Sequence, residues 1–225
     1  MVEFLPHLKV GVLASGRGSN FQSIIDSVKE NRLKAKVCLL ITDNPSAFAI
    51  ERARKHGIEH LVLKPKEFPS KDAFYIAVAE ALKKKDIGLV VLAGFMRIIG
   101  KPLIDAFPNR IMNIHPALLP SFTGLHAQKQ AVDYGVKISG CTVHFVDEGM
   151  DTGPVIIQAA VPVYHTDTEE SLSERILKLE HKIYTEAIRL FSEGRLKVEG
   201  RRVKITGEVS PEDYIVSPSL TKPSR

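Results

Sequence analysis

Short apolar runs alternate with helical patterns along the first half of the chain. The runs are rich in β-branched and aliphatic residues and are apolar on both sides, as buried parallel strands must be. They cover residues 9–14, 36–42, 60–63, 88–93 and 111–114. Helical spacing follows the first run at Phe21, Ile24, Ile25 and Val28, and the second at Ala49, Ile50 and Ala53. This alternation predicts a parallel sheet connected by right-handed βαβ crossovers.

The pattern changes in the second half. Residues 138–146 place Cys141, Val143 and Phe145 on one face, and residues 155–163 form another apolar run after a turn-prone Asp-Thr-Gly-Pro segment. A long helix follows, which Asp167 or Thr168 can cap. Its apolar face carries Leu172, Ile176, Leu179, Ile183 and Leu190. We therefore predict an α/β fold: a Rossmann-like, mostly parallel sheet with helices on both faces and antiparallel strands in the C-terminal half.

The length of 225 residues suits one domain, which we expect over residues 1–207, and the Pro- and Ser-rich residues 208–225 are expected to form a flexible tail. The apolar runs are shorter than the roughly 18 residues of a membrane helix, and no signal-peptide pattern opens the chain, so we expect a cytoplasmic protein without membrane contact. Cys38 and Cys141 lie in apolar runs, which favours free thiols of a reducing compartment over a disulfide.

The formal net charge is +5, but Lys and Arg are dispersed apart from one small cluster: Arg195, Lys197, Arg201, Arg202 and Lys204. A basic protein that binds nucleic acid usually gathers its cations on one face or along one helix. The dispersed charge favours a phosphorylated small molecule as the ligand, and we expect no nucleic-acid partner.

A glycine-rich loop, Ser15-Gly16-Arg17-Gly18-Ser19-Asn20, follows the first predicted strand and opens the first helix. Glycines permit close backbone approach, and free N–H groups at a helix N-terminus attract anions, so Gly18, Ser19 and Asn20 are candidates for a phosphate cradle. The loop is neither G-x-G-x-x-G nor a Walker loop, which weakens dinucleotide and nucleoside triphosphate interpretations. Taken alone, it is equally typical of a tight turn in which Ser19 or Asn20 caps the helix.

Asn113-Ile114-His115-Pro116 lies where the fifth predicted strand ends, at the edge where α/β sheets hold ligands. Alternation along the strand directs Asn113 and His115 to the same side. An amide can stabilise a tetrahedral oxyanion and an imidazole can exchange protons, a pairing suited to acyl transfer. For an isolated motif of this kind the structural interpretation is favoured, because buried His and Asn side chains often make purely structural hydrogen bonds.

An acidic, glycine-bearing loop covers residues 147–154. Such loops often only reverse the chain. In the functional interpretation Asp151 lies beside His115 and favours its imidazolium form. The acids lack calcium-loop spacing, and His, Cys and acidic residues do not cluster at metal-ligand spacing, so we expect no metal.

Together the motifs SGRGSN, LAGFMRI, NIHPALLP and DTGPVI, in this order within residues 9 to about 207, resemble phosphoribosylglycinamide formyltransferase. The resemblance implies the formyltransferase fold, with a phosphate-binding N-terminal half and a folate-binding C-terminal half. It implies transfer of the formyl group of 10-formyltetrahydrofolate to the amine of glycinamide ribonucleotide in purine biosynthesis, without a metal. It leaves open whether the protein is a monomer or a homodimer.

The resemblance also assigns residues. The catalytic trio would be Asn113, His115 and Asp151, with His115 as the proton donor. The ribonucleotide would be bound by Gly18, Ser19, Asn20, Glu180 and His126. The folate would be bound by Lys71, Met96, Arg97, Ile98, Ile99, Asn113 and Asp147.

The expected folate pocket makes chemical sense, because a pterin offers a flat face for apolar contacts and a glutamate tail requires a cation, for which Arg97 is the candidate. Lys71 stands where some relatives carry an arginine, and lysine keeps the charge but loses the bidentate fork. Without the resemblance, the segment around Met96 is better interpreted as a buried strand that ends in an apolar turn, with Met96 filling the core and Arg97 as a solvated charge.

Three alternatives are weighed against this function. Methionyl-tRNA formyltransferase shares the catalytic core but adds a C-terminal RNA-binding domain, for which we expect no room in this chain. Formyltetrahydrofolate hydrolase carries an N-terminal regulatory domain, whereas the first strand here begins by Lys9. A folate- or nucleotide-binding module without turnover has no need for Asn113, His115 and Asp151 together.

Overall fold

The computed structural model describes residues 7–207, which contain one nine-stranded sheet of order β3-β2-β1-β4-β5-β6-β7-β9-β8. The strands are β1 (Leu8–Leu13), β2 (Ala35–Thr42), β3 (Glu59–Val62), β4 (Leu89–Leu92), β5 (Ile111–His115), β6 (Ile138–Phe145), β7 (Val155–Pro162), β8 (Leu196–Glu199) and β9 (Arg202–Ile205). The first five strands are parallel, whereas β6 is antiparallel to both β5 and β7. The predicted fold class is confirmed.

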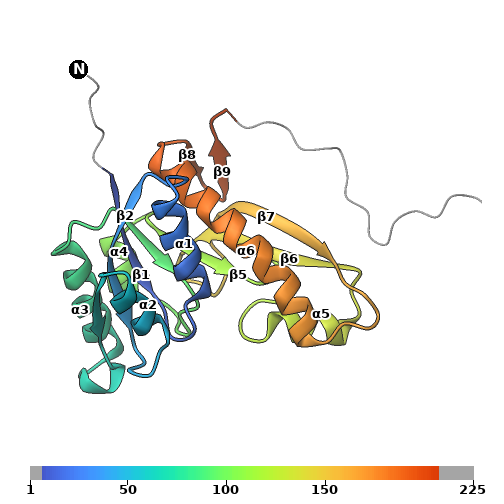
Figure 1. Cartoon of the computed structure of the whole chain (residues 1–225), viewed down its shortest axis with the longest axis horizontal. Helices are drawn as coiled ribbons and strands as arrows, with labels where there is room; N and C mark the ends of the chain where they lie inside the picture. The colour runs from blue at the N-terminus through green and yellow to red at the C-terminus, as the bar shows by residue number, and fades with distance from the viewer. Residues whose placement is uncertain (1–6, 208–225) are drawn as a thin grey trace, which may run out of the picture.

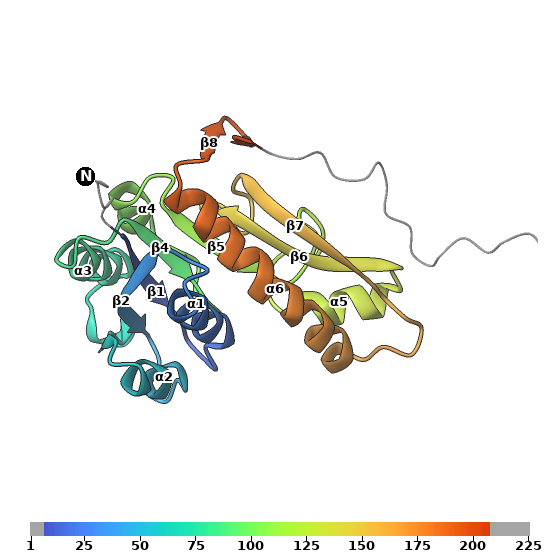
Figure 2. The ribbon, with the colours of Figure 1, turned by 45° about the horizontal axis from the view of Figure 1, so that its top comes forward.

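Helices cover both faces of the sheet (Figures 1 and 2). They are α1 (Ser19–Lys29), α2 (Ala49–Lys55), α3 (Lys71–Lys83), α4 (Lys101–Ala106), α5 (Ala127–Tyr134) and α6 (Glu169–Ser192), with a short 3-10 helix at Pro65–Glu67. Of the two candidate caps for the long helix α6, the Oγ1 atom of Thr168 accepts the first-turn amide of Ser171 at 3.3 Å.

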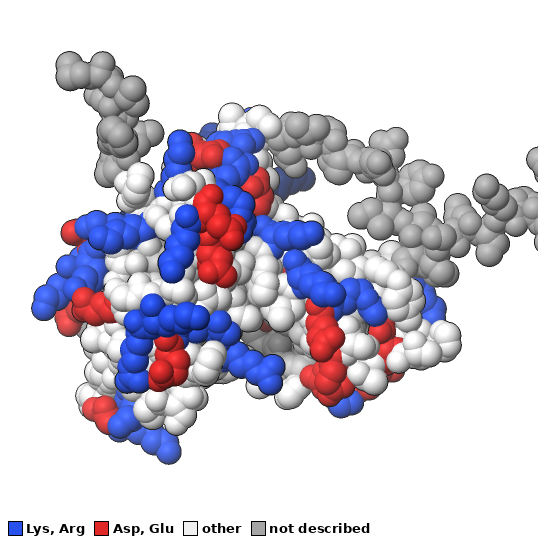
Figure 3. Space-filling view, in the orientation of Figure 1, with Lys and Arg blue, Asp and Glu red and all other residues white. Residues whose placement is uncertain are grey.

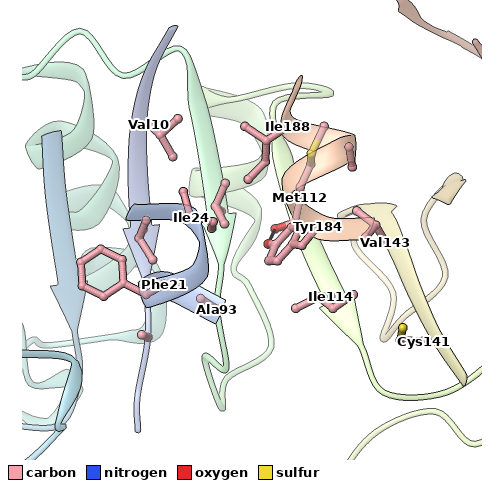
Figure 4. Close-up of a cluster of buried hydrophobic side chains, with 14 of the residues drawn as sticks. Val10, Phe21, Ile24, Ala93, Met112, Ile114, Cys141, Val143, Tyr184 and Ile188 are labelled. Atoms are coloured by element: carbon pink, nitrogen blue, oxygen red, sulfur yellow. Dashed lines mark hydrogen bonds between the residues drawn. The ribbon is translucent and has the colours of Figure 1, made fainter. Parts of the chain in front are cut away.

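Two buried cores follow from the alternation of side chains along the strands. Val10 and Val12 of β1 face α1 and α6, in the core that Figure 4 shows, whereas the neighbouring Leu13 faces α3 and α4. The buried Tyr184 of α6 donates its hydroxyl to the carbonyl oxygen of Met112, at 2.9 Å, and so ties α6 to β5. Met112 and Ile114 of β5 pack in the same core as α6, whereas Ile111 packs in the other core, so the odd-numbered residues of β5 face away from α6.

The strand order places a topological switch point at β1. The chain runs from β1 outward to β2 and β3, and then returns to the other side of β1 with β4. The loops that follow β1 and β4 therefore leave the same edge of the sheet side by side, where open α/β sheets bind ligands. Because β5 is parallel to β4, His115 at the end of β5 reaches this edge as well.

The structure adds elements that the apolar pattern did not reveal. The small basic cluster of the sequence lies on and beside the hairpin of β8 and β9. Each of these strands has four residues, which alternate between half-buried and exposed. Helix α3 is another addition, with Ser70 as its cap. On the face shown in Figure 3, Lys and Arg lie among Asp and Glu instead of forming one basic patch. The predicted tail, residues 208–225, lies outside the described residues.

Within residues 7–207 no helix combines the length and the apolar character needed to cross a bilayer.

Candidate active site

The three predicted catalytic residues lie together at the end of β5. His115 is 4% exposed, and its Nδ1 atom is 3.4 Å from Asp151 Oδ2. The Nδ2 atom of Asn113 is 3.5 Å from Asp151 Oδ1, at the long limit of a hydrogen bond. The other ring nitrogen of His115, Nε2, is 2.8 Å from the carbonyl oxygen of Phe122. Both nitrogens of the imidazole therefore face acceptor atoms.

Asp151 reaches this position because the loop between β6 and β7 folds back over the sheet. Two backbone features make the fold-back possible: Asp151 adopts a left-handed conformation with φ of 55°, and Gly153 packs so closely that a Cβ atom there would lie 1.7 Å from the carbonyl oxygen of Phe145. The amide of Gly124 donates at 2.9 Å to Asp151 Oδ2, the same oxygen atom that faces His115 Nδ1. Asp151 therefore has a fixed place beside the imidazole.

His144 completes the cluster and was not predicted. It pairs with Asn113 across β5 and β6, so both side chains project from the same face. Its Nδ1 atom is 2.9 Å from the carbonyl oxygen of Phe145, which can only accept, so Nδ1 carries the proton and Nε2 accepts from Asn113 Nδ2 at 3.2 Å. Burial lowers the pKa of His144 below its ordinary value of 6.5, because the charged ring is poorly solvated there. His144 thus orients the Asn113 amide.

The phosphate loop, residues 15–20, leads into the N-terminus of α1. Gly18 is the residue that caps the helix, with φ of 68°, and a Cβ atom there would lie 2.9 Å from Ala49 Cβ. No side chain caps the helix, so the interpretation in which Ser19 or Asn20 serves only as a cap does not hold. The first amides of α1 are left for an external acceptor, which is the geometry of a phosphate site.

Helix α2 braces this loop from behind. The amide of Ala49 donates to the carbonyl oxygen of Gly16 at 3.1 Å, and the Nε atom of Arg52 donates to the carbonyl oxygen of Arg17 at 2.9 Å. Arg17 itself is exposed. Arg52 was not among the predicted residues. The sequence gives no sign of this contact, because Arg52 on α2 and Arg17 in the phosphate loop meet only in the folded chain.

Glu180 lies behind the phosphate loop, on α6. It is 7% exposed, and its Oε2 atom accepts from Asn20 Nδ2 at 2.8 Å. Burial raises the pKa of this carboxyl above 4.5, and the hydrogen bond from Asn20 opposes the shift. The Oδ1 atom of Asn20 is buried and has no hydrogen-bond partner among residues 7–207. Two predicted ribonucleotide contacts thus form a linked pair, which leaves only the backbone of Asn20 to face a phosphate.

A cavity of about 570 Å³ lies beside the loop that follows β4, residues 94–99, here called the donor loop. Its walls combine apolar side chains with two cations, Lys71 and Arg97; the other lining residues are Pro65, Phe68, Ser70, Phe74, Tyr75, Met96 and Ile98. Four predicted folate contacts thus share one cavity. Ile99 differs, because its side chain is 6% exposed and packs in the core beneath α3 and α4.

Asp147, another predicted folate contact, braces its own loop. Its Oδ1 atom accepts from the hydroxyl of Thr152 at 2.6 Å and from the amide of Gly149 at 3.1 Å. These bonds close the segment that carries Asp151. The side chain of Asp147 is thereby engaged within the protein.

The sequence profile of the formyl transferase family matches residues 8–188. The chain belongs to this family.

Relatives agree with the profile. The phosphoribosylglycinamide formyltransferase of Bacillus subtilis (strain 168) is 47% identical over 181 residues, which are 80% of this chain and 93% of that protein. The trifunctional purine biosynthetic protein adenosine-3 of Drosophila pseudoobscura pseudoobscura is 42% identical over 210 residues, 92% of this chain and 15% of that protein. The crystal structure of glycinamide ribonucleotide transformylase 1 from Symbiobacterium toebii matches with a TM-score of 0.89 at 52% identity and covers 91% of this chain and 97% of that chain.

The chain therefore spans nearly all of the single-function relatives but about 15% of the trifunctional one. The resemblance drawn from the four motifs is confirmed.

In this formyltransferase the remaining predicted ribonucleotide contact is His126, on a different helix. His126 opens α5 with φ of 56°, and its exposed ring is 3.3 Å from Glu169 at the start of α6.

Both cysteines are free, and burial raises the pKa of Cys141 to about 12. Within residues 7–207 no three His, Cys, Asp or Glu side chains gather as a metal site would require.

Proposed function

We propose that Asn113, His115 and Asp151 carry the direct transfer of the formyl group of 10-formyltetrahydrofolate to the amine of glycinamide ribonucleotide. The observation that carries this proposal is the meeting of an amide, an imidazole and a carboxylate at the sheet edge from which the N-terminus of α1 and the loop of a cavity with two cations also emerge. The names of the relatives confirm the predicted function in purine biosynthesis and the predicted enzyme class. The family uses a folate-type one-carbon donor; its identity as 10-formyltetrahydrofolate is proposed.

Asn113 stabilises the tetrahedral intermediate. Attack of the amine nitrogen on the formyl carbon converts the carbonyl oxygen to an oxyanion, which a hydrogen-bond donor fixed in advance stabilises best. His144 accepts one N–H of the Asn113 amide and so fixes the direction of the other. The second N–H has only the long contact to Asp151 and is available to the oxyanion.

His115 and Asp151 move the proton. The amine nitrogen loses one proton as it becomes an amide, and N10 of the folate gains one as the bond to the formyl carbon breaks. An imidazolium at His115 supplies the proton to N10, and Asp151, 3.4 Å from its Nδ1 atom, stabilises that charged form. The Asp151 carboxylate also faces the cluster as an acceptor for the proton that the amine releases.

The binding sites divide between the two sides of this cluster. The amides of Gly18, Ser19 and Asn20 at the start of α1 hold the phosphate, and Glu180 takes the ribose hydroxyls or the amine region. The apolar walls of the cavity take the flat part of the folate, and Lys71 and Arg97 take its carboxylate tail.

The test is donor consumption in the wild type and in His115→Ala, followed by absorbance with glycinamide ribonucleotide present and then omitted. We expect donor loss that requires the ribonucleotide, a formylated product by mass, and loss of turnover in His115→Ala with ligand binding retained. His165→Ala, a change at an exposed histidine, is the matched control. Donor loss without the ribonucleotide would identify a hydrolase instead, and full turnover in His115→Ala would refute the catalytic assignment.

A further inference from the structure

Ser15 contacts two loops that the proposed function assigns to different ligands. It is the first residue of the phosphate loop. Its amide donates to the carbonyl oxygen of Gly94 at 3.0 Å, and its Oγ atom accepts from the amide of Met96 at 3.0 Å. Both bonds end on the donor loop. The adjacency of β1 and β4 at the switch point brings the two loops within reach of one side chain.

The next two donor-loop residues are also held by side chains from elsewhere in the fold. Arg97 Nε is 2.6 Å from Asp43 Oδ2, and the Asp43 side chain is 10% exposed. The hydroxyl of Tyr75 donates to the carbonyl oxygen of Ile98 at 2.9 Å. Ser15, Asp43 and Tyr75 thus anchor three consecutive residues of the donor loop.

The middle of the donor loop depends on these anchors because the side chains of Met96 and Ile98 bury little surface, whereas Ile99 at the end of the loop packs into the core. Met96 is 66% exposed and Ile98 is 50% exposed. A loop with few buried apolar contacts opens at low cost in free energy, so a few hydrogen bonds determine how much of the time it is ordered. Of the three anchors, Ser15 alone belongs to the phosphate loop.

We propose that Ser15 couples the two binding sites, so that a phosphate at the N-terminus of α1 tightens binding in the donor cavity. A phosphate on the first amides of α1 restrains residues 15–20. The restrained Ser15 hydroxyl holds the Met96 amide in place, and a ligand of the donor loop then loses less conformational entropy on binding. Linkage requires the reverse effect with the same factor. The inference rests on the proposed function for the identity of the two ligands.

The test measures the dissociation constant of tetrahydrofolate by calorimetry, without and with saturating ribose 5-phosphate. Ribose 5-phosphate carries the phosphate but lacks the glycinamide arm that would approach the folate, so direct contact between the ligands is avoided. We expect the wild type to bind tetrahydrofolate at least about fivefold more tightly when the sugar phosphate is present, the lower end of typical coupling. Ser15→Ala should lower this factor to nearly one, and Ser15→Thr, which keeps the hydroxyl, should restore it.

Two further variants separate coupling from simple damage. Tyr75→Phe removes another anchor and should weaken tetrahydrofolate binding while leaving the factor intact. Ser46→Ala, a change at an exposed serine of a neighbouring loop, should alter neither. A factor of one in the wild type, or the full factor in a folded Ser15→Ala, would overturn the inference. A wild type that transfers formyl without coupling refutes the coupling alone, whereas coupling without transfer refutes the proposed function alone.

Discussion

On the antiparallel pair β5 and β6, strand register fixes the polar side chains of the site, whereas at the ends of β1 and β4 the site is made of loop backbone. Asn113 lies opposite His144, and His115 lies opposite Thr142, so the ladder sets which side chains can meet. The phosphate loop instead offers amides, and its shape depends on contacts from α2. Strand pairing thus positions the polar side chains of the site, whereas contacts from a neighbouring helix position the backbone amides of the phosphate loop.

The two regions should therefore respond differently to substitution. Changes on the strand pair and its folded-back loop should lower kcat, because the proposed mechanism places these groups in the transition state. Changes at the phosphate and donor loops should raise KM, because the proposal assigns these groups to ligand binding. The following variants test this division, from the largest expected effect to the smallest.

Asp151→Asn should have the largest effect. The amide keeps the shape of the carboxylate but cannot stabilise an imidazolium at His115, and loss of a proton-transfer group costs roughly 10²–10⁴ in rate. The measurement is steady-state kcat, with dissociation constants for both ligands to show that binding is retained. Asp133→Asn, at a surface pair with Lys129, is the control. A kcat near that of the wild type would remove Asp151 from the mechanism.

Glu180→Gln should stabilise the fold and weaken ribonucleotide binding. Burial raises the pKa of Glu180, so the folded state binds its proton more tightly than the unfolded state, and stability falls as pH rises from 4.5 through the raised pKa. Glutamine keeps the acceptor for Asn20 without the charge. We expect a higher Tm above that window, by about 2–4 °C per kcal/mol gained, and a shrinking difference toward pH 4.5.

The matched control for this change is Glu174→Gln, at an exposed position of the same helix. Thermal unfolding of all three proteins across the pH range measures the effect. A Tm of Glu180→Gln that stays below the wild type at every pH would contradict the assigned burial cost.

Arg52→Ala should raise KM for the ribonucleotide and leave kcat nearly unchanged. Arg52 donates to the carbonyl oxygen of Arg17, and an exposed hydrogen bond from a charged donor contributes at most about 1.5 kcal/mol, which corresponds to at most roughly tenfold in affinity. Arg54→Ala, which breaks only the surface pair with Glu51, is the control. The measurement is the KM and kcat of both variants. A fall in kcat with an unchanged KM would show that Arg52 supports the reaction and not ribonucleotide binding.

Lys71→Arg should have the smallest effect, on the donor side. The guanidinium restores a planar fork for a carboxylate at the wall of the cavity, so KM for the folate should fall about two- to threefold, within the range of an exposed ion pair. Lys83→Arg, at an exposed lysine at the end of α3, is the control. A folate KM that does not move would show that the tail leaves the cavity elsewhere.

The apolar pattern predicted the parallel strands because a buried parallel strand is apolar on both faces, and the structure bears out seven predicted strands within one or two residues. The four-residue strands β8 and β9 escaped because their alternation is short and rich in charge. His144 left a signal that was not used: Thr142 and His144 alternate with the apolar residues of β6, which marks a polar face.

The phosphate loop was found because its residues are contiguous in sequence. Arg52 and Asp43 carry no such local signal, because each acts across a gap between loops that only the folded sheet closes. Ser15 lies within the motif, but its bond to Met96 is visible only in the folded chain. Contacts of this kind depend on which strand ends are neighbours. Sequence motifs therefore reveal residues that face a ligand more readily than they reveal the residues that hold them in place.

The pairing of β5 with β6 also limits how this protein can vary. Side chains alternate along a strand, so a single-residue deletion between Met112 and His115 would turn Asn113 toward α6 and bring an aliphatic side chain into the site. Length changes in the loops that follow β2 or β7 leave that alternation untouched. Insertions and deletions among functional descendants should therefore be absent from these two strands and concentrated in the loops.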